Sequence, residues 1–195
     1  MRLDFGNRSI AVCVFSLSIA VTFGIADAQN SSAFGGCGKA PIRLDSPFYL
    51  TTSIGIVAVE LPQGWVLDKT RSNPFFLIRF GEKYESARTL MYVNIERLEV
   101  PFSSAIKKDE RTFKESCADS RIEDVTAPEI LERGCEYKTQ RFFCNKKQGA
   151  YVDLATKISV GGLLMNVVLS GDNEAETARY KKDHEFLLKH LALVR

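Results

Sequence analysis

The sequence contains only two histidines, and none of its cysteines form a C-x-x-C pair. His184 and His190 are six residues apart, so they do not share one face of a helix, and no H-x-x-x-H spacing occurs. Zinc sites usually take several of their nitrogen or sulfur ligands from closely spaced residues. We therefore expect no metal site and no cofactor.

The chain also lacks an excess of one charge and the motif of a common class of hydrolases. It has 26 Lys and Arg against 24 Asp and Glu, whereas nucleic-acid-binding domains concentrate a strong basic excess on one face. No G-x-S-x-G nucleophile elbow is present. The glycine-rich segment 35–38 does not lie between a strand and a helix, so it is read as a loop and not as a phosphate cradle. We expect no nucleic-acid partner and name no catalytic residue.

The N-terminus carries the clearest functional signal. A short polar start with two arginines precedes the segment Ser9 to Ala26, which is almost wholly apolar or small, and Ala26-Asp27-Ala28 is followed by the polar Gln29. This three-part pattern is typical of a cleaved secretory signal. A retained anchor would need about 20 apolar residues, and lipidation would need a cysteine closer to the apolar core than Cys37. We predict cleavage between Ala28 and Gln29 and a periplasmic or secreted chain that does not span a membrane.

Four of the five cysteines remain after that cleavage, namely Cys37, Cys117, Cys135 and Cys144. An even number of cysteines in an oxidising compartment favours two disulfides over a reactive thiol. If 135–144 is one extended strand, its end cysteines lie about 30 Å apart at about 3.3 Å per residue, too far to bridge. Of the three possible connectivities we therefore prefer Cys117–Cys135 with Cys37–Cys144.

Alternating and continuous apolar runs predict a mainly β chain with two helices. The expected strands are 55–61, 65–67, 75–80, 90–97, 134–144, 149–158 and 163–169. Pro62-Gln63-Gly64 is read as a type I turn with proline in its second and glycine in its fourth position. One helix is expected from Ser103 or Ser104 to about Ala118, and another begins near Asp172 or Asn173.

The order of these elements indicates an α+β fold with a mainly antiparallel sheet flanked by helices. The nearly unbroken apolar strand Leu163 to Leu169 is typical of a strand covered on both faces. Its odd-numbered residues should face one helical layer, Leu164 and Val168 the other, and Trp65 should be buried. We expect a cleaved signal over 1–28, a flexible arm over 29–47 and one domain over 48–195.

Three segments carry a resemblance to a known family. They are Leu61-Pro62-Gln63-Gly64-Trp65, the strand with Leu163, Met165, Val167 and Leu169, and Ser170-Gly171-Asp172 leading into a helix with Tyr180 and Phe186-Leu187-Leu188. Over about 54–194 the chain resembles the PsbP-like α/β/α sandwich group, which includes extrinsic photosystem proteins, a nuclear Ran-binding relative and bacterial envelope proteins. The resemblance implies a non-enzymatic binding or assembly role and brings no catalytic residues with it.

A few polar residues remain as candidates. Asp153 is the best single carboxylate for catalysis, but the alternation of its strand predicts a solvated side chain, and His184 is expected at the edge of the core. A basic hairpin is either a contact for anionic lipid or polysaccharide or a solvated tip; its residues are Lys138, Arg141, Lys146 and Lys147. Asn30-Ser31-Ser32 forms a glycosylation sequon.

Two functions remain open after this survey. The leading one is a non-catalytic secreted or periplasmic binding or accessory protein, whose ligand is unknown and whose partner is a protein or an envelope component. The alternative is a secreted hydrolase with carboxylate-based chemistry. A deep pocket with converging polar side chains would favour the hydrolase, and a shallow, filled sandwich would favour the binding protein.

Overall fold

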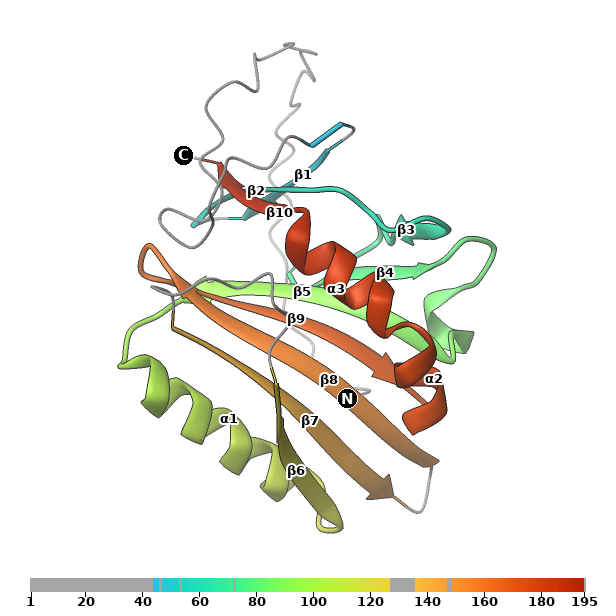
Figure 1. The fold of residues 1–195 in the computed structure, drawn as a ribbon, viewed down its shortest axis with the longest axis vertical. Coiled ribbons are helices and arrows are strands. Elements are labelled where there is room, and N and C mark those ends of the chain that lie inside the picture. Colours follow the sequence, from blue (N-terminus) through green and yellow to red (C-terminus); the bar gives the residue numbers. More distant parts are fainter. Residues whose placement is uncertain are drawn as a thin grey trace, which may run out of the picture.

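A computed structural model describes residues 44–45, 47–52, 54–71, 73–126, 136–146 and 149–194, and these form two antiparallel sheets and three α-helices (Figure 1). The signal segment, the sequon, Cys37, Cys135 and Lys147 lie outside these residues. None of the helices in the described ranges is long and apolar enough to cross a membrane. The mainly antiparallel α+β class predicted from the sequence is confirmed.

The larger sheet has seven strands in the order β3-β4-β5-β9-β8-β7-β6. Their bounds are β3 Trp65–Leu67, β4 Phe75–Arg79, β5 Thr89–Arg97, β6 Ser120–Val125, β7 Glu136–Lys146, β8 Gly149–Val160 and β9 Leu163–Gly171. A two-residue turn joins β8 to β9, with Val160 paired to Leu163. Gly161 and Gly162 have φ of 56° and 77°, the positive values that a type I′ hairpin turn requires and that glycine adopts without strain.

Helices cover both faces of this sheet (Figure 1). Helix α1, Phe102–Ser116, lies on one face, and the C-terminal helices α2, Glu174–Arg179, and α3, Lys181–Lys189, lie on the other. Strand β9 serves both layers, because Leu163, Met165, Val167 and Leu169 share a buried cluster with Leu187 and Leu188 of α3. Val168 packs with Phe113 of α1, and Leu164 with Ile106 of α1. The predicted division of β9 between two layers is confirmed, as is the burial of Trp65.

The smaller sheet has the order β1-β2-β10, with β1 Phe48–Thr52, β2 Gly55–Val59 and β10 Leu191–Val194. Its strand β10 pairs with β2, so that Leu191 lies opposite Val59. Leu50, Val57 and Leu191 extend the core on the α3 side. The sequence reading missed β1, β6 and β10, because each is short or mixed in polarity and each depends on a partner distant in the chain or across a turn.

The C-terminal helical region differs from its prediction in two ways. It begins where expected, since Asn173 caps α2 by accepting a hydrogen bond from the Glu176 amide at 3.0 Å. It then breaks at Tyr180 (φ −105°, ψ 12°) into two helices instead of one. The helical region also ends in a strand that the sequence did not predict. Leu191 opens β10, because α3 ends before His190, whose Nδ1 lies 2.8 Å from the Phe186 carbonyl.

The turn before Trp65 is displaced by one residue from its predicted position. The Trp65 amide donates to the Pro62 carbonyl at 3.1 Å, so Pro62 occupies the first position of the turn and Gly64 the third. Gly64 has φ 79°, a value that type I turns do not need at the fourth position but type II turns need at the third. The proline and glycine therefore mark the turn correctly but not its register.

The predicted disulfide connectivity is wrong, because Cys117 is bonded to Cys144 with a Cα–Cα distance of 5.9 Å. This pairing excludes both Cys117–Cys135 and Cys37–Cys144. The physical reason is β6, which follows α1 directly and pairs antiparallel with β7, with Ser120 opposite Cys144. The end of α1 is thereby brought to the end of β7, an arrangement that requires a strand the sequence reading did not identify.

Candidate functional site

Polar side chains gather on the sheet face beneath α1, and β8 supplies the two buried charged ones among the described residues. Asp153, Ala155 and Lys157 alternate with core residues and therefore point to the α1 side. Asp153 is 6% and Lys157 3% exposed, so the predicted solvated position of Asp153 is wrong. Register places Asp153 beside Phe142 and Ser170, and Lys157 beside Asn166.

These residues line a pocket of about 60 Å³ between α1 and the sheet. Asp109, Thr112 and Phe113 approach from α1, whose spacing of three and four residues puts them on one helix face. The strands contribute the rest of the lining: Tyr92, Phe142, Asp153, Ala155, Lys157, Asn166 and Val168. Since Thr112 is exposed and Asp109 half-exposed, the helix forms the mouth, and the buried β8 residues form the floor.

Lys157 is held in place by two contacts. Its Nζ lies 2.6 Å from Asp109 Oδ2 and 4.7 Å from the centroid of the Phe142 ring. A buried ammonium is costly unless it has a charged or π-electron partner. The ion pair therefore allows Lys157 to lie under the helix and links α1 to β8.

The pKa values of Asp153 and of two nearby tyrosines are shifted from their ordinary values. Burial raises the pKa of Asp153, and a hydrogen bond from Ser170 and the charge of Lys157 oppose that rise. Burial, and then the nearby Asp153, raise the pKa of Tyr151 to about 12. Burial also raises the pKa of Tyr92 well above its usual range. Both phenols remain protonated at any physiological pH and can donate hydrogen bonds.

An aromatic group continues the pocket wall beyond α1. Tyr92, which lines the pocket, contacts Phe76 on β4 at a centroid distance of 5.6 Å. Phe76 in turn meets Tyr84 edge-on at 4.8 Å, and the Arg71 guanidinium lies 4.0 Å from the Tyr84 centroid. The polar floor thus borders an aromatic surface with one cation at its outer end.

A second polar group lies beside the pocket, across β6 and β7. Lys138 Nζ contacts Asp124 at 3.1 Å and Glu110 at 3.7 Å, and Gln140 Nε2 donates to both carboxylates at 3.0 and 2.7 Å. Lys138 therefore does not form a free basic tip. Its neighbour Arg141 is also paired, with Glu174 at 2.9 Å on the opposite face of the sheet.

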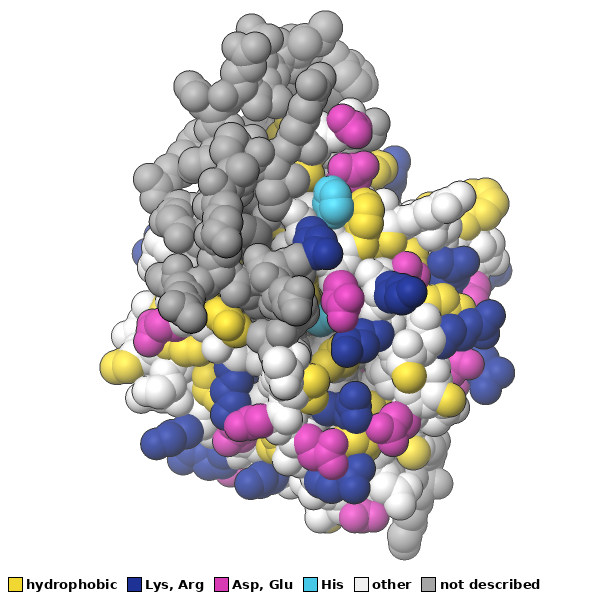
Figure 2. Space-filling model, viewed as in Figure 1, with side chains coloured by type: hydrophobic (Ala, Val, Ile, Leu, Met, Phe, Trp, Pro, Cys, Tyr) yellow, Lys and Arg dark blue, Asp and Glu magenta, His cyan; other side chains and the backbone are white. Residues whose placement is uncertain are grey.

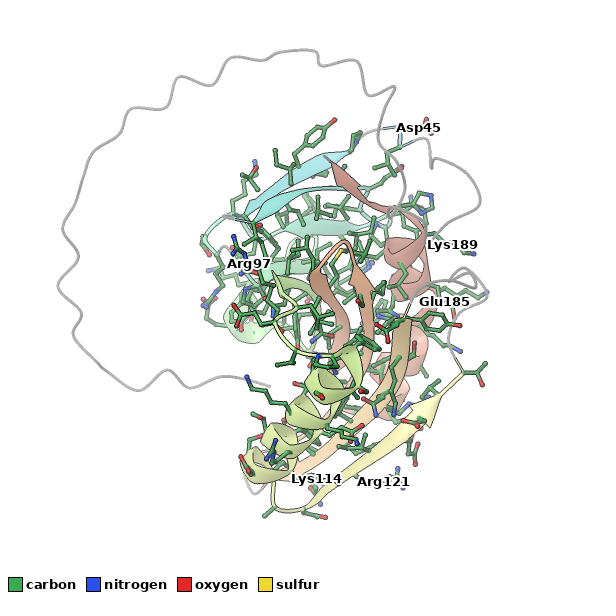
Figure 3. All side chains as sticks on the ribbon, turned by 90° about the vertical axis from the view of Figure 1, so that its left-hand side faces the viewer. Asp45, Arg97, Lys114, Arg121, Glu185 and Lys189 are labelled. Carbon is green, nitrogen blue, oxygen red and sulfur yellow. A yellow bond between two sulfur atoms is a disulfide. The ribbon has the colours of Figure 1, made fainter. Side chains whose placement is uncertain are left out.

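Charges on the outer surfaces are mixed. Figure 2 shows basic and acidic side chains interspersed over the described part of the face that carries α2 and α3. In the rotated view, Lys114 at the end of α1 and Arg121 on β6 lie at the lower end, while Glu185 and Lys189 project from α3 (Figure 3). A hollow of about 610 Å³ outside α1 has, among the described residues, only side chains of that one helix along it. It is an open surface with no second wall in the described residues.

His184 is not part of the pocket. It is fully buried on the α3 side, where its Nε2 donates to the Val167 carbonyl at 3.1 Å. Burial lowers the pKa of His184 to about 4, so the ring is neutral at physiological pH. The sequence reading placed it at the core edge, whereas it lies within the core and links α3 to the central strand β9.

The pocket fits the binding of a small group better than the enclosure of a whole substrate. Its volume of about 60 Å³ is far below the roughly 300–1,000 Å³ of pockets that enclose drug-sized ligands. In the described ranges, no three His, Cys, Asp or Glu side chains are grouped so as to hold a metal ion. The sequence reading missed the site because only α1 and four strands together create it.

Two solved structures share this architecture. The cyanobacterial PsbP protein (CyanoP) of Synechocystis sp. PCC 6803 matches with a TM-score of 0.52 at 16% identity, covering 80% of this chain and 98% of its own. LpqN of Mycobacterium tuberculosis, involved in cell envelope biogenesis, matches with a TM-score of 0.53 at 7% identity, covering 77% of this chain and 90% of its own. Neither a family model nor a curated protein matches the sequence. The chain therefore has the PsbP-like α/β/α sandwich fold that its sequence predicted.

Proposed function

We propose that this chain is a non-catalytic, extracytoplasmic binding or accessory protein that uses the pocket under α1 to hold one end of its ligand. The observation that carries the proposal is the combination of buried charges and small volume. Asp153 and Lys157 are buried at the floor of a pocket of about 60 Å³. Such groups fix the orientation of a bound group, and the volume limits that group to a few non-hydrogen atoms.

The carboxylate-based hydrolase is less well supported by the same geometry. A glycosidase needs two carboxyl groups flanking a bond of a bound sugar. Here one of the two carboxylates in the pocket, Asp109, is engaged with Lys157 at 2.6 Å. A sugar ring or a peptide group with its neighbours does not fit in the volume between them. These two facts favour binding over hydrolysis.

The proposed location outside the cytoplasm has three supports. The N-terminal 28 residues have the pattern of a cleaved signal, and the Cys117–Cys144 disulfide is typical of oxidising compartments. LpqN, which shares the fold, is described as involved in cell envelope biogenesis. N-terminal sequencing of the exported chain should find Gln29 first. A chain that begins at Met1, or one lipidated at Cys37, would contradict the proposed signal.

The binding role is tested by affinity capture from the native extracytoplasmic fraction. The mature chain, Asp153→Asn and Lys157→Met are immobilised in parallel, with Asp172→Asn as a matched control, because Asp172 pairs with Arg88 at the exposed end of β9. We expect a component that the wild type and the control retain and the pocket variants lose. Equal capture by all four, or hydrolytic activity that disappears in Asp153→Asn, would reject the proposed function.

A further inference from the structure

Aromatic and basic side chains meet where β3, at the edge of the larger sheet, approaches the junction between α2 and α3. Trp65 contacts Tyr180 edge-on at a centroid distance of 5.6 Å. The Arg79 guanidinium carbon lies 5.6 Å from the centroid of the Trp65 ring and 5.4 Å from that of Tyr180. The Arg179 guanidinium carbon lies 5.3 Å from the Tyr180 centroid. We call these four residues, together with Phe80, the arginine corner.

Neither guanidinium group of the arginine corner has a carboxylate partner among the described residues. Arg79 donates a hydrogen bond to the Gln63 carbonyl at 3.3 Å. The carboxylate of Asp183 accepts instead from the Trp65 indole N–H at 2.8 Å. Arg179 is exposed, and the contact that holds it is with an aromatic ring. Because a guanidinium has five N–H donors and a permanent charge, both groups keep donors for an anion outside the chain.

The turn before β3 positions both Arg79 and its neighbour Phe80. Gly64 lies against Arg79, since a Cβ at this glycine would come within 3.0 Å of Arg79 Nη2. The Phe80 amide donates to the Gly64 carbonyl at 2.9 Å, so both residues are held on the same turn. The Phe80 side chain is 81% exposed, the highest value among the exposed large hydrophobics of the described residues. A single exposed apolar side chain is common, but this one projects next to cations that have no acidic partner.

We propose that the arginine corner docks the mature chain on the surface of an anionic lipid bilayer. Each guanidinium would bind a lipid phosphate, and Phe80 would enter the boundary between headgroups and acyl chains. Guanidinium groups bind phosphate oxygens through paired N–H donors, and binding at a membrane interface combines apolar burial with attraction to anionic lipids. Because separate lipids serve the two arginines, the guanidinium groups need not converge on one anion.

The basic hairpin considered in the sequence analysis is less suited to this role. Lys138 and Arg141 are paired with carboxylates at 3.1 and 2.9 Å, and a paired cation attracts a distant anion only weakly because its field is largely cancelled. The arginine corner has no such pairing among the described residues. It packs against the apolar cluster on the α3 side, whereas the pocket lies under α1, so docking would not occupy the pocket.

Co-sedimentation with vesicles tests the proposal. The mature chain is mixed with vesicles of phosphatidylglycerol and phosphatidylcholine, or of phosphatidylcholine alone, at a series of salt concentrations. We expect retention on the anionic vesicles only. The retention should weaken as the salt concentration rises, because attraction between exposed charges is screened.

Three variants should weaken binding to the anionic vesicles. Arg79→Gln and Arg179→Gln should each reduce the partition coefficient about fivefold, and the double variant about 30-fold. Phe80→Ala should reduce it about fivefold, because less apolar area is buried at the interface. Arg97→Gln is the matched control, since Arg97 is exposed and lies at the far end of β5. It removes the same charge and should leave the partition coefficient nearly unchanged.

Two further variants separate docking from damage to the fold. Arg79 packs on two rings, so a melting curve must show that its variant is folded. Arg179 is exposed, so Arg179→Glu reverses a charge without entering the core and should abolish retention. Phe80→Trp should give blue-shifted emission with anionic vesicles, measured above the constant signal of the buried Trp65.

Several results would overturn the docking proposal. They are equal retention on both kinds of vesicle, an equal loss in Arg97→Gln, or unchanged binding of Arg179→Glu. If the wild type ignores the vesicles but Arg179→Glu loses a captured acidic protein, the surface binds that protein and not lipid. Asp153→Asn should bind vesicles like the wild type. If vesicle retention fails while the pocket variants still lose a captured component, the binding function stands and only the docking is rejected.

Discussion

The two faces of the seven-stranded sheet bury different kinds of side chain, although the same strands build both. Under α3 the buried cluster is apolar and continuous, and it extends through β9 to Leu50 and Leu191 of the smaller sheet. Under α1 the apolar contacts fall into two smaller clusters around Phe113 and Ile106. Asp153 and Lys157 are buried on this second face.

This difference separates stability from binding within one sheet. A continuous apolar cluster excludes water and contributes most of the free energy of folding. Buried charges contribute little net stability, because the cost of removing them from water offsets their attraction. We therefore expect side chains on the α3 face to contribute most of the folding free energy. The α1 face can then include buried polar groups that bind a ligand.

The largest effect should come from damage to the α3 face. Leu169→Ala removes a side chain with 0% exposure and should reduce the free energy of unfolding by about 2–5 kcal/mol, because it leaves a cavity in a packed core. Urea denaturation measures it. Val100→Ala, at a position 47% exposed, is the control and should change stability by less than about 0.5 kcal/mol. Equal losses at both positions would contradict the division between the faces.

The α1 face should depend on its covalent link. The Cys117–Cys144 disulfide spans 27 residues, and removing it by replacing both cysteines with alanine should cost about 3.5 kcal/mol of unfolding free energy, because the unfolded chain regains that loop's freedom. Denaturation without reductant compares the variant with the wild type. Peptide mapping by mass spectrometry should find the Cys117–Cys144 link, and by elimination we expect Cys37–Cys135 as the second bond. A Cys117–Cys135 peptide would refute this assignment.

Acid should act on the two faces in opposite directions. The pKa of His184 is lowered to about 4 in the folded state. Between pH 6.5 and 4 the His184 ring is therefore protonated in the unfolded chain and still neutral in the folded chain. Its contribution to the unfolding free energy falls by about 3 kcal/mol over that window. The pKa of Asp153 is raised, so the folded chain binds the proton more tightly than the unfolded chain, and its contribution grows as the pH falls toward 3.8.

Two variants separate these contributions. His184→Gln should flatten the loss of stability between pH 6.5 and 4, and Asp153→Asn should steepen it, as measured by melting temperature across the pH series. His190→Gln is the control for a half-buried histidine outside the α3-side cluster. Parallel pH profiles for all variants would show that neither buried group titrates differently in the folded chain.

The smallest effect is expected at Lys157. Replacing it with methionine should change the unfolding free energy by less than about 1 kcal/mol, since a buried ion pair and a well-packed apolar side chain are often equivalent in stability. Asp109→Ala should cost more, about 1–3 kcal/mol, because it leaves the Lys157 ammonium buried without that carboxylate. Chemical denaturation of both variants decides this. A larger loss for Lys157→Met than for Asp109→Ala would mean that Lys157 is structural.

The sequence predicted most of the fold because its central strands have strong local patterns. The division of β9 between two layers and the helix that starts near Ser103 were both predicted correctly, because the spacing of apolar residues indicates which faces of a strand or helix are buried. Cys117 and Cys144 were predicted to form disulfides, but their pairing with each other and the smaller sheet were not predicted, because β6 and β10 form only through pairing with β7 and β2. Their own residues favour no strand strongly.

The pocket under α1 could not be predicted from the sequence pattern either, but the cause is different. Alternation in β8 shows that Asp153 and Lys157 share a face with Ala155, and an alternating polar face usually meets water. Only the position of α1 above that face makes it buried. One signal was available: the apolar stripe of α1 must cover part of an alternating sheet face, so some of the polar residues on that face had to lie beneath it.

The pairing of β10 with β2 has a consequence for how the chain is made. Val59 and Leu191 are neighbours in the smaller sheet, yet nearly the whole domain lies between them in sequence. Contacts between such distant residues slow folding, and β2 cannot pair with β10 until residues 191–194 are present. Until then the β2 edge that will receive β10 is open to strands of other chains. A chain truncated just before Leu191 should therefore aggregate more readily than the full chain, because the edge of β2 that pairs with β10 would stay open.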